Sequence, residues 1–379
     1  MRLHEHEAAD IFEAAGIPVP KRGLASTPGE VERIAGEIGY PVMLKAQVLA
    51  GGRGLAGGVL AAEGPMEAYT NAVDILGSEI HGLTVRSVLV TGKAAIRKEL
   101  YLGITIDGYG GKPVVIVSAE GGMSVEEVAE RYPEKISSLT LDATRELFPF
   151  EARSLLGKVG LTSREMVACA DVLVRLYQVF MSSDALIAEI NPLAVLDNGG
   201  LMAVDAVLEV DDSALSRPGN TISVDSERIE NPIERKGREI GVTYVDLDGD
   251  IGIIASGAGL GMATMDIIAK NLRPANFLET GGGITEKLLY DTMGLMMMKQ
   301  GLRAVFINIY GGINPIHEGA KGVVRYIREH NVTIPVVAKA LGNRQEETWD
   351  IFREGGVHVV TDVATEKAVE RLVEILEGR

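Results

Sequence analysis

The chain has little of what would tie it to a membrane, an oxidising compartment or nucleic acid. Its single cysteine, Cys169, cannot form an internal disulfide, and its apolar neighbours are typical of a small core residue in a reducing compartment. No apolar run is long enough to span a bilayer, and the N-terminus is charged where a signal peptide would be apolar. We therefore expect a soluble cytoplasmic protein without a membrane partner.

Positive charge is also scarce. Lysine and arginine total 37 against 53 aspartate and glutamate residues, which gives a formal net charge of −16. Such a field repels phosphate at long range and disfavours nucleic acid as a partner. The phosphate-binding pattern GxxxxGK[ST] is absent as well. An anionic ligand would therefore have to be held by local hydrogen-bond donors or by a metal ion.

Glycine is plentiful, and it gathers in two informative loops. They are Ala50-Gly-Gly-Arg-Gly-Leu-Ala-Gly-Gly58 and Ile309-Tyr-Gly-Gly-Ile-Asn-Pro-Ile-His317. Each follows an apolar run that predicts a strand, and the bare backbone of such loops lets amide N–H groups close on phosphate or carboxylate oxygens. The sequence thus predicts two anion-binding places, in a chain long enough for about two or three domains.

The last third of the chain alternates strand and helix patterns. Apolar, β-branched segments that each precede a helical pattern are residues 252–256, 275–278, 304–310, 334–340 and 358–360. This alternation, with short connections, predicts a parallel sheet with helices on both faces, as in a flavodoxin-like domain. Glycine-rich turns end the first three strands, at residues 256–259, 280–283 and 310–313. We expect these turns to converge at the edge where such sheets bind ligands.

The earlier part of the chain mixes helices with strands. Thr27-Pro-Gly-Glu30 has a capping residue, a proline at the first helical position and a glutamate three residues after the cap, which predicts a helix to about Gly36. Residues 185–190 and 201–207 predict two strands joined by a hairpin turn. The polar stretch of residues 211–249 has weak periodicity, and we place the domain boundary within it.

Lys45 lies inside an apolar strand pattern, where an ammonium is costly unless it meets an anion. A phosphate bound by the glycine loop that follows would meet that need, with Arg53 adding charge. The alternative is that Lys45 extends to solvent at the strand end. The N-terminal segment His4-Glu-His-Glu7 is expected to be a solvated helix start rather than a metal site.

Glu189, Asn191 and Asp205 carry the kind of oxygen atoms that Mg²⁺ prefers as ligands. Strand alternation puts Glu189 and Asn191 on one face, and the predicted hairpin would bring Asp205 beside them. An ordinary turn opened by Asn191-Pro192 is the alternative. His317, at the start of a predicted helix, is a weaker candidate for a phosphoryl carrier.

A series of motifs in this order and spacing resembles one known family. They are Leu3-His-Glu-His-Glu-Ala-Ala-Asp-Ile-Phe12, Lys45-Ala-Gln-Val48, Gly51-Gly-Arg-Gly54, Arg97-Lys-Glu-Leu-Tyr-Leu-Gly103, Glu189-Ile-Asn-Pro-Leu193, Gly257-Ala-Gly-Leu-Gly-Met-Ala-Thr-Met-Asp266, Pro274-Ala-Asn-Phe-Leu278 and Asn308-Ile-Tyr-Gly-Gly-Ile313. The chain resembles, over its full length, the β subunits of ADP-forming succinyl-CoA synthetase, also called succinate–CoA ligase.

The resemblance implies α+β and α/β architecture in two domains. Residues 1–235 would form an ATP-grasp nucleotide-binding domain with an inserted subdomain at about 21–103, and residues 243–379 a flavodoxin-like, parallel-sheet CoA-ligase domain. In the family, this acid–thiol ligase of the tricarboxylic acid cycle works only as an αβ or α2β2 assembly. The β subunit binds ATP and Mg²⁺, and the α subunit binds CoA and carries a phosphorylated histidine. The reaction is ATP + succinate + CoA = ADP + phosphate + succinyl-CoA.

Roles are carried over only to positions that match the family's motifs. The residues that would contact the nucleotide are Lys45, Gly51, Gly52, Arg53 and Glu99. Those that would hold Mg²⁺ are Asn191 and Asp205, and Glu189 would orient the partner's histidine during phosphoryl transfer. The residues that would bind the acid substrate are Ser256, Gly311, Gly312 and Ile313.

Several positions depart from the family's usual pattern. Leu55 and Val207 stand where lysines are usual, Ser256 replaces an asparagine, and residues 314–317 read Asn-Pro-Ile-His. These departures leave two alternatives open: a CoA ligase for another dicarboxylate such as malate, or a catalytically impaired, nucleotide-binding regulatory subunit. ATP is the expected nucleotide, and GTP is not excluded because no motif selects the base.

Overall fold

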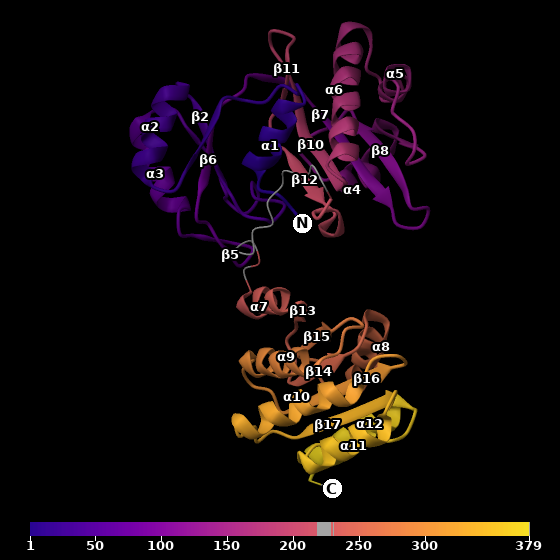
Figure 1. The fold of residues 1–379 in the computed structure, drawn as a ribbon. Coiled ribbons are helices and arrows are strands. Elements are labelled where there is room, and N and C mark those ends of the chain that lie inside the picture. Colours follow the sequence, from indigo (N-terminus) through magenta and orange to yellow (C-terminus); the bar gives the residue numbers. More distant parts are fainter. Residues whose placement is uncertain (218–228, 230, 379) are drawn as a thin grey trace. The chain divides into compact units, whose positions relative to one another are not determined.

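The computed structural model describes residues 1–217, 229 and 231–378 (Figure 1). The chain divides into two compact units, Met1–Val224 and Asp225–Arg379, and the division falls outside the described residues but inside the polar stretch of residues 211–249. Helix α7 (Pro232–Ile240) packs on strand β13 (Thr243–Asp246) and helix α9 (Glu286–Met298). The second unit therefore begins earlier in the chain than expected, since the first domain was expected to end at residue 235 and the second to begin at residue 243. Among the described helices, none combines the length and the apolar character needed to cross a membrane.

The first unit is built on an antiparallel sheet of strands in the order β11-β10-β7-β8-β9, with β12 also pairing with β10. These strands are β7 (Ile96–Asp107), β8 (Lys112–Ser118), β9 (Ile136–Thr140), β10 (Ala185–Leu196), β11 (Leu201–Ala203) and β12 (Val207–Val210). The helices of this large lobe are α1 (Glu5–Ala14), α4 (Val125–Arg131), α5 (Pro149–Lys158) and α6 (Ser163–Ser182). Helices α5 and α6 pack against the sheet, and α1 contacts β12 and α6. The predicted hairpin between β10 and β11 is confirmed.

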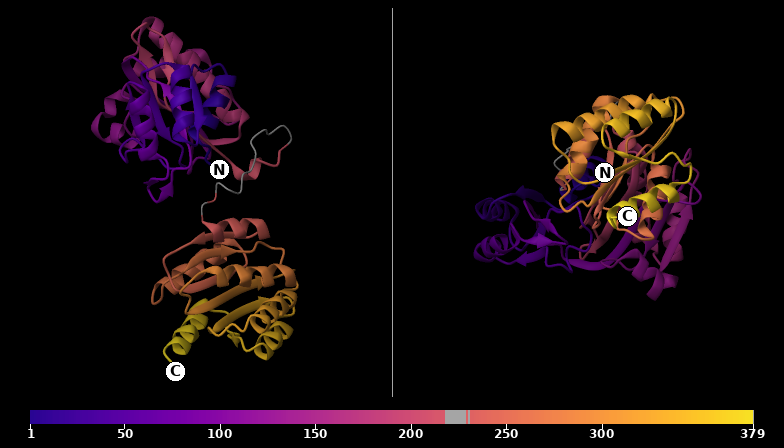
Figure 2. Two further views of the ribbon diagram at one scale, coloured as in Figure 1. Left: turned by 90° about the vertical axis from the view of Figure 1, so that its left-hand side faces the viewer. Right: turned by 90° about the horizontal axis from the view of Figure 1, so that it is seen from below.

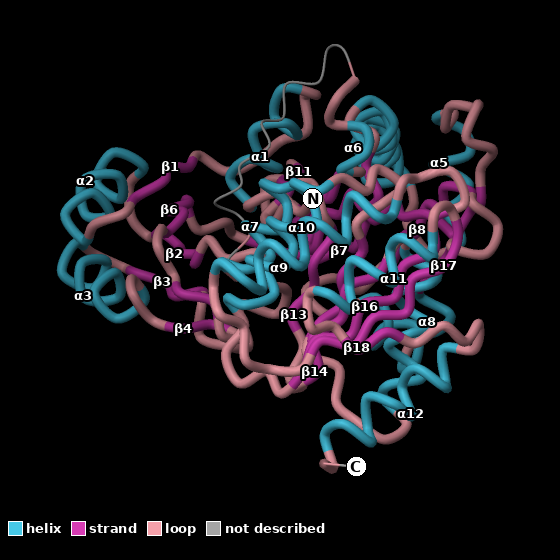
Figure 3. Tube along the Cα trace, turned by 60° about the horizontal axis from the view of Figure 1, so that its bottom comes forward, coloured by secondary structure: helices cyan, strands magenta, loops and turns pink. Residues whose placement is uncertain are grey.

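Residues 22–92 form a small lobe of the first unit with its own core. Its antiparallel sheet has the order β1-β6-β2-β3, and helices α2 and α3 pack against it (Figure 3). The elements are β1 (Arg22–Ala25), α2 (Pro28–Ile38), β2 (Val42–Ala46), β3 (Val59–Ala62), α3 (Pro65–Ile75), β4 (Glu79–Ile80), β5 (Leu83–Thr84) and β6 (Val88–Gly92). The capping box that begins α2 is confirmed, since Thr27 and Glu30 exchange hydrogen bonds. The lobe ends earlier than the expected residue 103 because β7 belongs to the large sheet.

The second unit contains a six-stranded sheet in the order β13-β15-β14-β16-β17-β18, parallel except for the edge strand β13. The elements after β13 are β14 (Ile251–Ala255), α8 (Ala258–Ala269), β15 (Asn276–Glu279), α9, β16 (Ala304–Gly311), α10 (Ile316–Glu329), β17 (Val336–Gly342), α11 (Gln345–Glu354), β18 (His358–Val359) and α12 (Thr365–Leu376). Residues of α9, α10 and α11 share one core, and residues of α8 and α12 share another across the sheet (Figure 2). The predicted strand–helix alternation is confirmed.

A buried amide joins two strands of this sheet where their ladder is short. Strands β14 and β15 pair directly only at Ala255 and Glu279. Nearer the start of both strands, the Asn276 side chain accepts a hydrogen bond from the Ile253 N–H and donates one to the Ile253 carbonyl, both at 2.9 Å. Because both backbone groups are buried, this neutral contact replaces ladder bonds whose loss would leave them unsatisfied.

Candidate functional site

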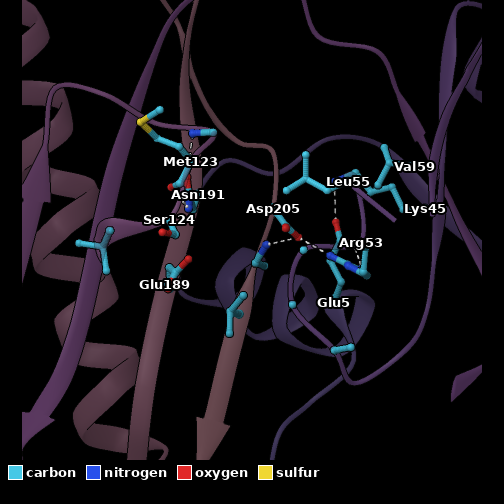
Figure 4. A pocket seen from close by; sticks show the side chains of 18 of the residues that line it. Glu5, Lys45, Arg53, Leu55, Val59, Met123, Ser124, Glu189, Asn191 and Asp205 are labelled. Atoms are coloured by element: carbon cyan, nitrogen blue, oxygen red, sulfur yellow. Dashed lines mark hydrogen bonds and ion pairs between the residues drawn. The ribbon is translucent and has the colours of Figure 1, made fainter. Parts of the chain in front are cut away.

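A pocket of about 840 Å³ in the first unit is bordered by both lobes (Figure 4). The small lobe contributes β2 and the glycine loop that follows it, and the large lobe contributes the start of α1, the 122–127 segment, β10 and residues 205–207. The expected site residues that border it are Lys45, Gly51, Gly52, Arg53, Glu189, Asn191 and Asp205. Leu55 and Val207, the two positions without the usual lysine, border the same pocket.

The partner of Lys45 is a carboxylate that the sequence did not predict. Lys45 is only 5% exposed, and its Nζ donates to Glu5 Oε1 at 2.7 Å and to the Val204 carbonyl. The alternative of a lysine extending to solvent is therefore wrong. The expectation of a solvated N-terminal segment is also wrong for Glu5, which is 6% exposed. Its helix begins where the sequence indicated, but packing of α1 between the lobes turns Glu5 inward.

Arg53 extends this contact into a cluster that bridges the lobes. Its Nη1 lies 2.8 Å from Glu5 Oε2, and its Nη2 lies 2.9 Å from Asp205 Oδ1. We call Glu5, Lys45, Arg53 and Asp205 the bridging cluster. Two cations of the small lobe thus face two acids of the large lobe (Figure 4). The lysine within an apolar strand pattern was the one sequence signal that an anion lies nearby, and it did not indicate that the anion is a side chain of the protein.

The two acids of the bridging cluster have opposite pKa shifts. Burial raises the pKa of Glu5, and the negative charge of Asp205 adds to this, while Lys45 and Arg53 oppose it. Burial also acts to raise the pKa of Asp205, but the charges of Lys45 and Arg53 outweigh it and lower that pKa. Asp205 therefore presents an ionised carboxylate at the pocket wall, which suits it to bind a cation.

Glu189 and Asn191 lie together on the other side of the pocket (Figure 4). The Asn191 Oδ1 accepts a hydrogen bond from the Gly122 N–H at 2.9 Å, and its Nδ2 donates to the Met123 carbonyl at 3.0 Å. Burial raises the pKa of Glu189, although hydrogen bonds from Asn191 and Tyr101 oppose the shift. The Tyr101 hydroxyl donates to Glu189 Oε2 at 3.3 Å. These contacts fix the direction of both side chains.

The oxygen atoms at this pocket fit a magnesium ion that keeps other ligands of its own. Asn191 and Asp205 border one cavity, and an amide oxygen engaged by one N–H retains a second lone pair. In the described part of the chain, no group of three or more His, Cys, Asp and Glu side chains could hold a metal ion. Mg²⁺ commonly takes one or two protein oxygens and fills its remaining positions with water and phosphate oxygens.

Glu99 does not border this pocket. It lies in a neighbouring hollow of about 470 Å³ with Arg97, Lys98 and residues 119–121. A Cβ built on Gly122 would meet the Glu99 carboxylate, so the 121–122 backbone is the wall between the two hollows. Of the residues expected to contact the nucleotide, Glu99 is therefore the one that the structure separates from the others.

In the second unit, the predicted convergence of the glycine-rich turns is confirmed. Ala255 is in register with Glu279 and with Asn308, so β14, β15 and β16 end at the same edge. The Ser256 hydroxyl accepts from the Tyr310 N–H at 2.9 Å and donates to the Tyr310 carbonyl at 3.2 Å. Ser256 thus ties the end of β14 to the end of β16.

The loop of Gly311, Gly312 and Ile313 begins at this edge and leads into α10. The Asn343 N–H donates to the Gly311 carbonyl at 2.7 Å, and the Asn343 side chain donates to the Ile313 carbonyl at 3.1 Å. Ile313 is 92% exposed. The neighbouring His317 is only 2% exposed, and its Nε2 accepts from Arg344 at 2.8 Å. Burial of this kind does not favour His317 as a phosphoryl carrier.

Two protein-family models match the chain, one in each unit. The model described as an ATP-grasp domain matches residues 2–195, and the model described as CoA-ligase matches residues 254–373. The predicted order of an ATP-grasp fold followed by a CoA-ligase domain with a parallel sheet is therefore confirmed.

The chain is similar over its full length to named relatives. It is 42% identical to the β subunit of succinate–CoA ligase (GDP-forming) from Thermus thermophilus over 375 residues, which covers 98% of this chain and 99% of the relative. It is 40% identical over 381 residues to the β subunit of succinate–CoA ligase (ADP-forming) from Roseiflexus sp. (strain RS-1), with both chains covered completely. These similarities confirm the resemblance seen in the motifs.

Solved structures resemble the whole chain as well. ATP citrate lyase from Methanothrix soehngenii, in complex with citrate and coenzyme A, matches with a TM-score of 0.72 over 100% of this chain and 99% of its own. The sequence identity is 17%, so this likeness concerns the fold alone.

Proposed function

The chain belongs to the family of succinate–CoA ligase β subunits, and from this premise we propose how it takes part in the reaction. It binds ATP with Mg²⁺ in the first unit and the acid substrate in the second. A separate α subunit supplies the CoA site and the histidine that is phosphorylated in transit. The overall reaction is ATP + succinate + CoA = ADP + phosphate + succinyl-CoA, catalysed by an αβ or α2β2 assembly in the cytoplasm.

The observation that carries the proposal is the pocket of the first unit, where buried cations and oxygen ligands meet. Lys45 and Arg53 bind phosphate oxygens, with help from the N–H groups of Gly51 and Gly52. Asn191 and Asp205 hold Mg²⁺, which neutralises charge on the phosphates when it is bound. Glu99 contacts the nucleotide from the neighbouring hollow. The pocket thus holds, through local contacts, the negatively charged phosphates that the net charge of the protein repels.

Glu189 orients the histidine of the α subunit. A hydrogen bond from the Tyr101 hydroxyl fixes its carboxylate. Burial is the largest influence on the pKa of Glu189, and it raises that pKa. A fixed carboxylate can accept a hydrogen bond from one ring nitrogen of a histidine, which leaves the other nitrogen free to attack the terminal phosphorus. Glu189 therefore sets the direction of attack rather than forming a bond itself.

In the second unit, backbone donors bind the acid. The N–H groups of Gly311, Gly312 and Ile313 precede helix α10, and such amides bind carboxylate or phosphate without a side-chain cation. The Ser256 hydroxyl, which is bonded to the Tyr310 backbone, supports this loop and borders the acid. The substrate carboxylate and the phosphohistidine of the partner thus meet the same kind of donor.

Phosphorylation of the partner tests the proposal. The chain is co-expressed with its candidate α subunit and incubated with Mg²⁺ and ATP labelled on the terminal phosphate. We expect label on the α subunit, and ADP and phosphate release that requires both succinate and CoA. Asp205→Asn should lower the labelling rate at least about 100-fold, because it removes a charged metal ligand. Asp171→Asn, at an exposed carboxylate of α6, should change nothing. Equal labelling in both variants would contradict the metal assignment.

Two further arms decide the open alternatives. Replacing succinate by malate and other dicarboxylates compares kcat/KM between acids, and a higher value for another acid would make that acid the substrate. Replacing ATP by GTP decides the base, a useful comparison because the GDP-forming and ADP-forming relatives are similarly identical to this chain. Nucleotide binding without any labelling of the partner would identify an impaired, regulatory subunit.

A further inference from the structure

One cation on the wall of the first unit's pocket has no task in the proposed reaction. The basic residues that border this pocket are Arg2, Lys45 and Arg53. Lys45 lies 2.7 Å from a Glu5 oxygen, and Arg53 contacts both Glu5 and Asp205. The half-buried Arg2 side chain has no hydrogen bond or ion pair with any residue that the structure describes. Of the three cations, Arg2 is therefore the one whose donors are open to a ligand.

Backbone pairing fixes the face of the sheet on which Arg2 lies. The segment of residues 1–3 runs antiparallel to β12, where Arg2 is paired with Glu209. On the other side of β12, Val207 is paired with Glu189 of β10. Because side chains alternate along a strand, Arg2, Val207 and Glu189 share one face of the sheet. All three border the pocket, and we call this part of its wall the Arg2 corner.

The electrostatics of Glu189 agree with this placement. Burial is the largest influence on the pKa of Glu189 and raises it, whereas the positive charge of Arg2 acts to lower it. The guanidinium is therefore near the carboxyl group that orients the partner's histidine in the proposed reaction. The terminal phosphoryl group of the nucleotide has to pass the Arg2 corner to reach that histidine.

We propose that Arg2 binds the terminal phosphoryl group of ATP and holds it during transfer to the histidine of the α subunit. The proposal rests on the proposed function, because it adds a ligand for the same nucleotide. In the transfer, the bond from the terminal phosphorus to the ADP oxygen breaks as the bond to the imidazole nitrogen forms. Negative charge is then spread over three phosphoryl oxygens. A guanidinium offers five donors in a planar fork that fits two such oxygens, and it exchanges no proton.

No other side chain of the Arg2 corner supplies a positive charge. Glu189 offers a carboxyl group, and the neighbouring Asn191 offers an amide. Val207, at a position where a lysine is usual, adds only an apolar side chain. Arg2 thus supplies from the N-terminal segment a charge that β12 lacks at the pocket.

Calorimetry on the full-length chain separates the terminal phosphate from the rest of the nucleotide. ATP and ADP are each titrated in excess Mg²⁺, and the dissociation constant of ADP is divided by that of ATP. Arg2→Met should lower this ratio about tenfold, because ADP lacks the group that Arg2 binds. Arg2→Lys, which keeps the charge but loses the fork, should give a ratio between the two. An unchanged ratio in Arg2→Met would overturn the inference.

The rate of histidine labelling measures the same contact during the transfer itself. With the α subunit bound and ATP saturating, Arg2→Met should lower the labelling rate constant at least about 100-fold. The variant should fold, because backbone bonds hold the N-terminal segment: the Leu3 N–H donates to the Leu208 carbonyl and the Val210 N–H to the Met1 carbonyl, both at 2.9 Å. Equal loss of affinity for both nucleotides, with an unchanged rate constant, would make Arg2 a structural residue and overturn the inference.

Arg164→Met serves as the control for loss of one positive charge. Arg164 lies in α6 of the same lobe, is exposed and does not border the pocket. The ratio and the rate constant should stay within about twofold of wild type, because solvent and salt screen a distant exposed charge. A fall of similar size in Arg164→Met and Arg2→Met would reduce the effect to net charge, and the inference would fail.

The double variant Arg2→Met/Val207→Lys returns a cation to the Arg2 corner from the neighbouring strand. Val207 lies on the same face and borders the same pocket. The ratio of dissociation constants should recover to within about threefold of wild type, because the added ammonium restores the missing charge. No recovery would overturn the inference while the nucleotide site stands. If wild type neither bound ATP nor labelled its partner, the proposed function would fail together with the inference.

Discussion

The two units of the chain prepare for anions by different means. The pocket of the first unit relies on charged side chains, with Lys45 and Arg53 of the small lobe balanced by Glu5 and Asp205 of the large lobe. The ligand edge of the second unit relies on neutral groups, namely backbone amides of a glycine loop and hydrogen bonds from Ser256 and Asn343. Charge organises one site and backbone shape the other.

This difference determines which substitutions each unit tolerates. A charge-based site fails when a partner is removed, because the remaining ion is buried without compensation. A backbone-based site fails when a side chain is added where the backbone must come close. The first unit should therefore be sensitive to loss of charge, and the second to gain of volume. The following predictions test that contrast.

The largest effect is expected from Gly342→Ala in the second unit. Gly342 has φ +118°, and a Cβ there would overlap the Gly311 carbonyl oxygen on the neighbouring strand. The strain and the overlap together should lower the free energy of unfolding of this unit by about 4 kcal/mol. Trp349, the chain's single tryptophan, lies in α11 and reports on this unit through its fluorescence during urea unfolding.

Gly356→Ala is the matched control for that variant. Gly356 has φ +77°, but nothing lies within 4 Å of the added Cβ. Only the cost of placing alanine in the left-handed backbone conformation remains, and it should lower the free energy of unfolding by about 1 kcal/mol. Equal destabilisation by both variants would show that close backbone approach at the ligand edge is not what matters.

A smaller effect is expected from Lys45→Met in the first unit. The change leaves Glu5 with one cation in place of two at a buried position, and we expect a loss of about 3 kcal/mol. Lys93→Met breaks a pair with Glu63 whose side chains are 42% and 62% exposed, so its cost should stay within about 0.5 kcal/mol. Urea unfolding followed by circular dichroism measures both, and similar losses would remove the distinction between buried and exposed pairs.

The same contrast explains which parts of the structure could be predicted from the sequence. The second unit could be predicted from local sequence patterns, because each strand and its following helix are adjacent in the chain. Topology alone then places the turns at one edge of the sheet. The capping box of Thr27 and Glu30 and the turn between β10 and β11 are equally local. These features were predicted and are confirmed.

The bridging cluster could not be predicted in the same way. Lys45 and Glu5 are separated by 40 residues, and their contact depends on how two lobes pack rather than on any periodicity. The apolar strand pattern around Lys45 indicated that an anion was needed but not which one, and in the structure that anion is the Glu5 carboxylate. Likewise, the weak periodicity of residues 211–249 predicted neither α7 nor the unit against which it packs.

The reaction rate of the Cys169 thiol offers the most sensitive test, because this native residue reports on opening of the first unit without any substitution that changes its stability. It lies in α6, is fully buried, and burial, together with the charge of Glu165, raises the pKa of its thiol to about 12. At neutral pH almost no thiolate exists, so a thiol reagent should react only when the first unit opens. We expect Lys45→Met to speed labelling about a hundredfold, which corresponds to its predicted loss of stability. Gly342→Ala should leave the rate unchanged, since its damage is confined to the second unit. If Gly342→Ala accelerated labelling as much, the two units would unfold as one, and the separation of a charge-based site from a backbone-based site would not extend to their stability.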